Sequence, residues 1–224
     1  HLLWANFGMG KTHSLLHIKH LANQTNGALI PLYTVMPKRS KGFIEVYRAI
    51  VSEMPFDYLG EKLVAIGNSC SGSLVNHPMF SKSPGVINAI LAMRSGDSEK
   101  QVLSRQWLFA QPGLRASEMR KIKITYRIKT PEDAINSLNS ITKLITYSSN
   151  KKHKLILLFD EYQRIGELRP NVRQEINAGM HGYFDSNPNR IEILMTFSFG
   201  NKDNLAYLLS NELLSRSEPQ SLVL

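Results

Sequence analysis

The sequence predicts a three-layer α/β/α fold around a mainly parallel β-sheet, and two segments carry this prediction. Near the N-terminus, the apolar run Leu2-Leu3-Trp4 leads into a glycine-containing turn and then into the helix-like run 14–18. Much later, five consecutive apolar residues, 155–159, end at Asp160 and Glu161. A short run that is apolar on both faces is typical of a strand inside a parallel sheet. Both segments are therefore expected to end at the carboxyl edge of one sheet, where open α/β sheets bind ligands.

The first elements follow in order from this reading. A strand is expected at about residues 2–6 and a helix at about 11–23, joined by the glycine turn. The pair Asn26-Gly27 favours a turn, and the apolar run 28–35 then predicts a second strand. Pro31 is a mild objection to that strand, because proline has no N–H for a ladder.

Helices dominate the next stretch. Residues 43–51 have helical periodicity, and a weaker pattern covers about 59–66. Residues 68–84 are rich in Ser, Gly, Asn and Pro, which predicts a loop. Two further helices are expected at about 84–94 and 98–109.

The middle of the chain changes from irregular to strongly helical. Residues 111–129 are basic and show no period. Thr130 then fits a helix N-cap, with Pro131 at the first position and Asp133 three residues on. The apolar stripe that follows, up to Ile145, is expected to pack in the core rather than against a partner.

The remaining elements complete one domain. After the strand that ends at Asp160, a helix is expected at about 172–184, a fourth strand at 191–198 and a last helix at 204–214. The chain 1–224 therefore reads as a single domain with a largely helical insertion at about 68–130.

Composition places the chain among ordinary globular proteins. It has 224 residues, with 42% hydrophobic and 20% charged residues. The single cysteine, Cys70, permits no internal disulfide and fits a cytoplasmic location. No stretch approaches the ~20 apolar residues of a membrane helix, so no membrane partner is expected.

The net charge of +9 is concentrated in one segment. Residues 100–154 hold twelve Lys and Arg residues against three acidic ones, and charges balance in the rest of the chain. A segregated basic field is typical of contact with a polyanion such as DNA. A solvated surface insertion that keeps the protein soluble explains the same pattern equally well.

The glycine turn fits a phosphate-binding loop. Gly10, Lys11 and Thr12 match the Walker A pattern, while Ala5 stands where that pattern has its first glycine. Lys11 is expected to reach the β- and γ-phosphates, and the Thr12 hydroxyl to ligate Mg²⁺. A plain glycine turn with a solvated lysine is the alternative. The expected nucleotide-binding residues are Asn6, Phe7, Gly8, Met9, Gly10, Lys11, Thr12 and His13.

The two carboxylates after residues 155–159 complete this site. Asp160 is expected to hold Mg²⁺, directly or through water, and Glu161 to polarise the attacking water. A strand followed by a solvated acidic turn would look similar in isolation, but the upstream glycine loop makes that alternative unattractive.

Three later polar residues are candidates for the same chemistry. Ser198 and Asn201 follow the fourth strand, where a polar group can lie near the γ-phosphate, between the glycine loop and Asp160-Glu161. A simple turn around Gly200 is the alternative. Arg216 follows the last helix and is a candidate for stabilising phosphoryl transfer in a neighbouring subunit, unless it is a solvated or capping arginine.

These motifs, in this order, resemble the AAA+ family of P-loop ATPases, and within it the origin-recognition (initiator-type) branch. The resemblance rests on residues 5–12, 155–161, the polar strand end at Ser198, and the run from Leu213 to Arg216 followed by residues 221–224. The middle segment, with Arg105-Gln106-Trp107-Leu108, Leu114-Arg115 and residues 119–122, is similar to ATP-binding proteins of bacterial phage-defence clusters of the bacteriophage-exclusion type.

The resemblance implies ATP and Mg²⁺ as cofactors and an oligomer completed through the ATP site. It implies hydrolysis that powers or gates a larger assembly acting on DNA. AAA+ proteins also have adenine-contacting residues before the first strand and a helical lid after the last helix, so an excised module is expected here. A non-hydrolysing nucleotide-dependent scaffold is the main alternative. A small-molecule kinase is disfavoured by the Asp160-Glu161 strand end and by Arg216.

Overall fold

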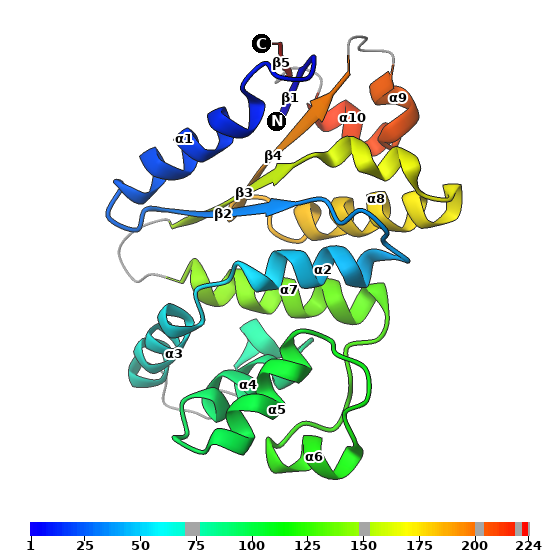
Figure 1. Ribbon diagram of the computed structural model, residues 1–224. Coiled ribbons are helices and arrows are strands. Elements are labelled where there is room, and N and C mark those ends of the chain that lie inside the picture. The colour runs from blue at the N-terminus through cyan, green and yellow to red at the C-terminus, as the bar shows by residue number, and fades with distance from the viewer. Residues whose placement is uncertain (70–76, 148–152, 200–203, 218–220, 224) are drawn as a thin grey trace.

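The computed structural model describes residues 1–69, 77–147, 153–199, 204–217 and 221–223. Within these ranges, five parallel strands form one sheet with the order β2-β3-β4-β1-β5 (Figure 1). The strands are β1 (Leu2–Ala5), β2 (Leu29–Val35), β3 (Lys154–Asp160), β4 (Ile191–Ser198) and β5 (Ser221–Val223). The predicted α/β fold with a parallel sheet is confirmed, and β5 is an additional edge strand that the sequence reading did not include.

Pro31 is tolerated in β2 because of the strand's place in the sheet. β2 is an edge strand that pairs with β3. The N–H of Lys154 donates to the carbonyl of Ala28, and the N–H of Met36 donates to the carbonyl of Asp160. In a parallel strand, alternate residues direct their backbone groups to the same side. The backbone groups of even-numbered residues of β2 therefore face β3. The backbone of Pro31 faces the unpaired side of the strand, where its lack of an N–H costs no ladder hydrogen bond.

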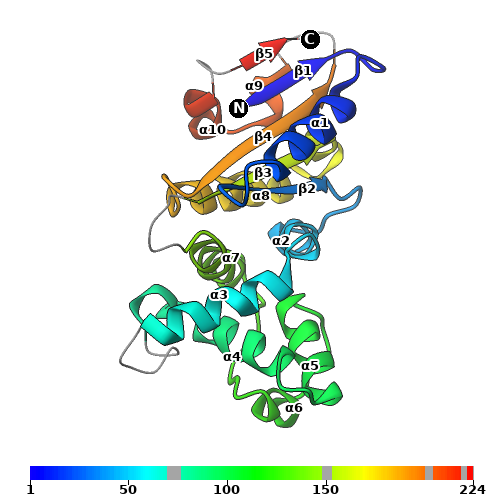
Figure 2. The same ribbon diagram turned by 90° about the vertical axis from the view of Figure 1, so that its left-hand side faces the viewer.

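Helices lie on both faces of the sheet. Tyr33 and Thr34 are successive residues of β2, so their side chains point to opposite faces. Lys19 of α1 (Lys11–Asn23) lies over the ring of Tyr33, whereas the Thr34 hydroxyl donates to the carbonyl of Ala49 in α2 (Phe43–Ser52). Helix α8 (Pro170–Asp185) shares the α2 face, and α7 (Pro131–Ile145) packs against both (Figures 1 and 2).

The residues of the predicted insertion form a further helical layer beyond α7. Figure 2 shows this layer below α2 and α7, on the side away from the sheet. It contains η2 (Pro78–Phe80), α4 (Pro84–Met93), α5 (Ser98–Leu108) and α6 (Ala116–Lys121), and it lies beside α3 (Phe56–Ser69). Hydroxyl groups of Ser83 and Ser137 bond at 3.1 Å, and the indole of buried Trp107 donates to the carbonyl of Tyr126 at 2.7 Å.

Two helical regions also differ from the prediction. Residues 111–129 are not wholly irregular, because the Glu118 carboxylate accepts from the N–H of Arg115 at 2.6 Å and supports the short helix α6. The single helix expected at 204–214 is divided into α9 (Asn204–Leu208) and α10 (Asn211–Ser217). The Ser210 hydroxyl accepts from the N–H of Leu213, so Ser210 starts a new helix as its N-cap.

Candidate nucleotide site

The glycine loop connects the buried end of β1 to the first turn of α1. Gly8 and Gly10 have φ values of 79° and 77°, in the left-handed region that favours glycine. Gly10 is the N-cap of α1 and provides no side-chain acceptor, and the first turn contains no acidic residue. The N–H groups at the start of α1 are therefore left for an anion, and the helix dipole favours one there.

Lys11 folds back onto this loop. Its ammonium group donates to the carbonyl of Ala5 at 3.0 Å and to the carbonyl of Asn6 at 2.6 Å. Burial lowers the pKa of Lys11, while the nearby carboxylates of Glu161 and Asp160 oppose that shift. The alternative of a solvated lysine does not fit, since Lys11 is among the buried residues.

Asp160 joins the two sequence motifs. Its Oδ2 accepts from the Thr12 hydroxyl at 2.7 Å and from the Tyr33 hydroxyl at 3.0 Å. Its Oδ1 accepts from the Thr196 hydroxyl and from the N–H of Glu161. Burial alone raises the pKa of Asp160, but the hydrogen bonds from Thr196, Thr12, Tyr33 and Glu161 outweigh it and hold this pKa below its usual value. The side chain is therefore a firmly held carboxylate.

Glu161 begins the turn after β3 in a left-handed conformation, with φ of 56°. Its N–H donates to Asp160 Oδ1 at 2.9 Å and to the Thr196 hydroxyl at 3.1 Å. Its carboxylate lies 3.3 Å from the guanidinium of Arg164, which in turn donates to the carbonyl of Met36 at 3.0 Å. Arg164 lies in η3 (Tyr162–Glu167), so this short helix ties Glu161 to the end of β2.

A cavity of about 260 Å³ brings most of the predicted residues together. Because β4 pairs with both β1 and β3, Ser198 lies between the glycine loop and the two carboxylates. The Ser198 N–H donates to the amide oxygen of Gln163 at 3.2 Å. The cavity is lined by Phe7, Gly8, Met9, Gly10, Lys11, Thr12, His13, Glu161 and Ser198.

Two predicted residues are not tested by this geometry. Asn201 lies outside the described residues. Arg216 belongs to α10, whose backbone is described but whose side chain at this position is not. Their roles remain predictions.

The sequence reading missed four side chains that hold the site: Tyr33, Arg164, Gln163 and Thr196. Tyr33 comes from the distant strand β2 and looks like an ordinary strand residue in the sequence. Thr196 offered a usable signal, because Thr196 and Ser198 are two residues apart and so share one face at the carboxyl end of their strand. Arg164 and Gln163 lie just after Glu161 and carry no periodic pattern.

The donor set fits a magnesium ion. Thr12 offers a hydroxyl oxygen and Asp160 offers carboxylate oxygens, and the two side chains already touch. Mg²⁺ prefers such oxygen ligands and is usually held by one or two carboxylates together with substrate phosphates. The exposed glycine loop beside them is where such phosphates would lie.

Several cations of segment 100–154 are already paired with other groups of the chain. Lys121 pairs with Glu99 at 2.5 Å, Lys100 with Asp97 at 3.1 Å and Lys154 with Glu192 at 2.6 Å. Arg127 donates to the carbonyl of Leu114. Among the described residues of this segment, several exposed cations form no side-chain hydrogen bond or ion pair, including Arg105, Arg120, Lys123 and Lys129. A basic field therefore exists, but it is weaker than the count of charges suggests.

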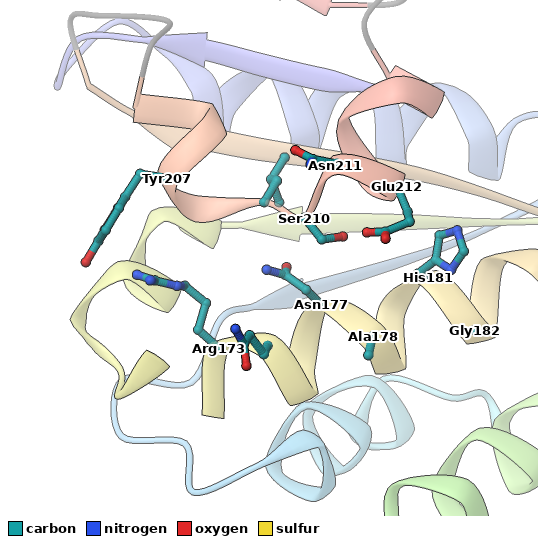
Figure 3. Close-up of a pocket in the computed structure, with 11 residues that line it drawn as sticks. Arg173, Asn177, Ala178, His181, Gly182, Tyr207, Ser210, Asn211 and Glu212 are labelled. Carbon is teal, nitrogen blue, oxygen red and sulfur yellow. The ribbon is translucent and has the colours of Figure 1, made fainter. Parts of the chain in front are cut away.

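A larger groove of about 750 Å³ lies between α8 and the α9–α10 pair (Figure 3). Arg173 stacks on the exposed ring of Tyr207 at its mouth, with the guanidinium carbon 4.1 Å from the ring centre. None of the predicted site residues lines this groove. The Nη1 atom of Arg173 and the Oδ1 atom of Asn177 are buried and have no hydrogen-bond partner among the described residues.

No helix in the described part of the chain has the length and apolar character needed to cross a membrane. Comparison with protein-family models gave no match, and comparison with curated proteins found no relative of this chain. The glycine-loop cavity and its hydrogen bonds are therefore the basis for a functional proposal.

Proposed function

We propose that this chain is a Mg²⁺-dependent ATPase module of the P-loop type. The observation that carries the proposal is the 2.7 Å hydrogen bond between Thr12 and Asp160, which joins the glycine loop to the acidic strand end. Lys11 and Glu161 line the same cavity. A phosphate cradle, a cation, a metal-binding pair and a second carboxylate are the parts that phosphoryl transfer to water requires.

Each residue has a distinct role in this proposal. The N–H groups of the glycine loop and of the first turn of α1 bind the phosphates. Lys11 exchanges the carbonyls of Ala5 and Asn6 for phosphate oxygens. Thr12 and Asp160 would hold Mg²⁺, which supplies positive charge to the phosphates when bound. Glu161 accepts a proton from the attacking water, and Ser198 lies beside the transferred group.

Arg164 acts on this chemistry through Glu161. Its ion pair with the carboxylate and its bond to the carbonyl of Met36 restrict where the carboxylate can lie. Arg164 is therefore a positioning residue, since it touches the proposed base rather than the substrate.

We further propose that the module is of the AAA+ type and works in an oligomer. The place of β4 between β1 and β3 supports this type, because it brings Ser198 between the phosphate loop and the carboxylates. In this proposal the site is completed by a neighbouring subunit, and hydrolysis powers or gates a DNA-associated assembly, such as one for phage defence. Steady-state phosphate release, measured with and without double-stranded DNA, tests both parts together.

The competing function is a nucleotide-dependent scaffold that does not hydrolyse ATP. The Glu161–Arg164 ion pair favours it, because the carboxylate is already engaged within the chain and would have to leave Arg164 to reach a water. Measurement of phosphate release distinguishes the two functions, because a scaffold binds ATP without releasing phosphate.

Replacing Glu161 with glutamine is expected to preserve ATP binding and to lower turnover by about 10²-fold, the scale of a lost general base. Glutamine keeps the size of the side chain but cannot accept the proton. Binding is measured with a fluorescent ATP analogue and turnover by phosphate release. Equal phosphate release from the variant and the parent chain would show that Glu161 is not the base.

Contact with DNA should depend steeply on salt if the basic insertion makes it. Each neutralised phosphate contributes roughly −0.9 to the slope of log affinity against log salt. Reversing the exposed pair Arg120 and Lys123 to glutamate is expected to flatten this slope by roughly two contacts, as measured by fluorescence anisotropy with a labelled duplex. Lys121 is left intact, because its loss would free Glu99.

The matched control reverses Lys38 and Arg39, which are exposed in the loop after β2 and lie outside the insertion. This pair carries the same change of charge. A slope that falls equally in both variants, or duplex binding that does not depend on salt, would assign the basic segment to surface solubility.

A further inference from the structure

A second cavity, of about 250 Å³, lies between α2 and the helical insertion. Arg48 of α2 forms one wall, the loop 110–114 after α5 forms another, and Arg127 to Lys129 close it before α7. Ile44 and Trp107 provide an apolar floor. It shares no lining residue with the glycine-loop cavity.

The lining of this cavity is cationic. It includes Arg48, Arg127 and Lys129 and contains no aspartate or glutamate. Among the described residues, these three cations make one ion pair, from the Arg48 guanidinium to the Glu45 carboxylate at 3.7 Å. The Asp133 carboxylate also lies close by, because it accepts from the backbone N–H of Lys129 at 3.1 Å. Two carboxylates do not balance three positive groups, so the walls carry excess positive charge.

Both guanidinium groups are fixed before any ligand arrives. Arg48 Nε donates to the carbonyl of Phe109 at 3.0 Å, and its Nη2 donates to the carbonyl of Ala110 at 2.6 Å. Arg127 donates to the carbonyl of Leu114. Ala110 and Gly113 have φ values of 48° and 98°, so the loop that receives these bonds is held in a left-handed path. The cations thus cannot simply turn apart to relieve their repulsion.

Like charges gathered around a partly enclosed space repel one another more strongly than they do in bulk water. An anion among them removes that cost. The planar donors of arginine suit the tetrahedral oxygens of phosphate, and preorganised donors lose little freedom on binding. At ~30 Å³ per water molecule, the cavity holds roughly eight waters, which leaves room for a phosphate and part of an attached sugar.

We propose that this cavity is a second anion site, which binds a single phosphate group through Arg48, Arg127 and Lys129. The group belongs either to the backbone of a nucleic acid or to a free mononucleotide. If the phosphate comes from a nucleic acid, this proposal rests on the proposed DNA contact and adds a specific contact to it. Binding of phosphate itself does not depend on ATP hydrolysis.

The test uses the full chain with Lys11→Ala, so that the glycine loop does not contribute phosphate binding. Inorganic phosphate is titrated by calorimetry at low salt into this protein and into versions that also carry Lys129→Gln or Lys82→Gln. Both lysines are exposed and belong to the helical insertion, but only Lys129 lines the cavity. Circular dichroism checks that each variant is folded.

Lys129→Gln is expected to weaken phosphate binding about tenfold, the scale of one charge-assisted hydrogen bond, and Lys82→Gln to leave it unchanged. Arg48→Lys keeps the charge but loses the planar donors, so it should also weaken binding. Equal phosphate affinity in the two lysine variants, or no binding by the folded Lys11→Ala protein, would overturn the proposal.

Two further titrations identify the source of the phosphate. For a nucleic-acid phosphate, Lys129→Gln weakens binding of a short duplex more than Lys82→Gln does, and lowers the salt slope by about one contact. For a free mononucleotide, AMP binds more tightly than inorganic phosphate, and the duplex affinity is the same in both variants. Failure of ATP hydrolysis alone leaves all of these results unchanged.

Discussion

Replacement of Lys11 with alanine is expected to abolish ATP binding. The ammonium group lies in the glycine loop, within hydrogen-bonding distance of the carbonyls of Ala5 and Asn6, and Glu161 lines the same cavity. Without this cation, the phosphates lose a direct positive partner beside the carboxylates of Asp160 and Glu161. Removing a charge-assisted contact to a multiply charged ligand in a partly buried site is among the costlier single changes.

Equilibrium binding of a fluorescent ATP analogue measures this effect, with Lys38→Ala as the matched control. Lys38 is an exposed lysine in the loop after β2 and should leave binding unchanged. Thermal unfolding without nucleotide separates the two roles of Lys11, because the alanine also loses two hydrogen bonds within the loop. If a folded Lys11→Ala protein bound the analogue as the parent does, the glycine loop would not be a phosphate site.

Replacement of Arg216 with alanine is expected to lower hydrolysis in the assembled protein by about 10³-fold, the lower end for a supplied arginine. The reason is the proposed completion of each site by a neighbour. Affinity of the unassembled chain for ATP should change little, since α10 contributes no residue to the glycine-loop cavity among the described residues. Phosphate release is measured above the concentration at which the chain assembles.

A mixture of Arg216→Ala and Lys11→Ala proteins provides a sharper test. One variant contributes an intact nucleotide site and the other an intact arginine, so mixed assemblies should recover part of the activity. This recovery of hydrolysis requires only that the two kinds of subunit be neighbours in the same assembly. If the variants co-assemble and the mixture stays inactive, Arg216 lies outside the chemistry and the scaffold function gains weight.

The parts of the fold that the sequence predicted are those with strong local signals. The apolar run before Asp160 became β3, buried between two strands, and the Thr130 cap became the start of α7, with the Thr130 hydroxyl accepting from the N–H of Asp133 at 3.1 Å. The glycine loop and the two carboxylates could be expected at one sheet edge because both follow strands of a parallel sheet.

The rest depends on contacts between distant residues. Tyr33 reaches Asp160 from the edge strand β2, and no local pattern distinguishes it from any other strand tyrosine. The break between α9 and α10 follows from the cap at Ser210, which competes with a continuous helical period. Helix α6 is too short for periodicity to reveal it. Arg48 and Lys129 are far apart in the sequence, so their shared cavity appears only once α2 packs on the insertion.

The proline in the edge strand has a consequence for how copies of this chain can meet. A strand edge with a complete row of donors invites another sheet to continue the ladder, and such growth has no natural end. On the outer side of β2, residue 31 offers a carbonyl but no N–H. A hydrogen-bond ladder between β2 and a strand of another copy would lack one bond near its centre. Contact between copies along this side therefore has to rely on side chains. The strand thus terminates the sheet, which favours assemblies of fixed size over open-ended fibres.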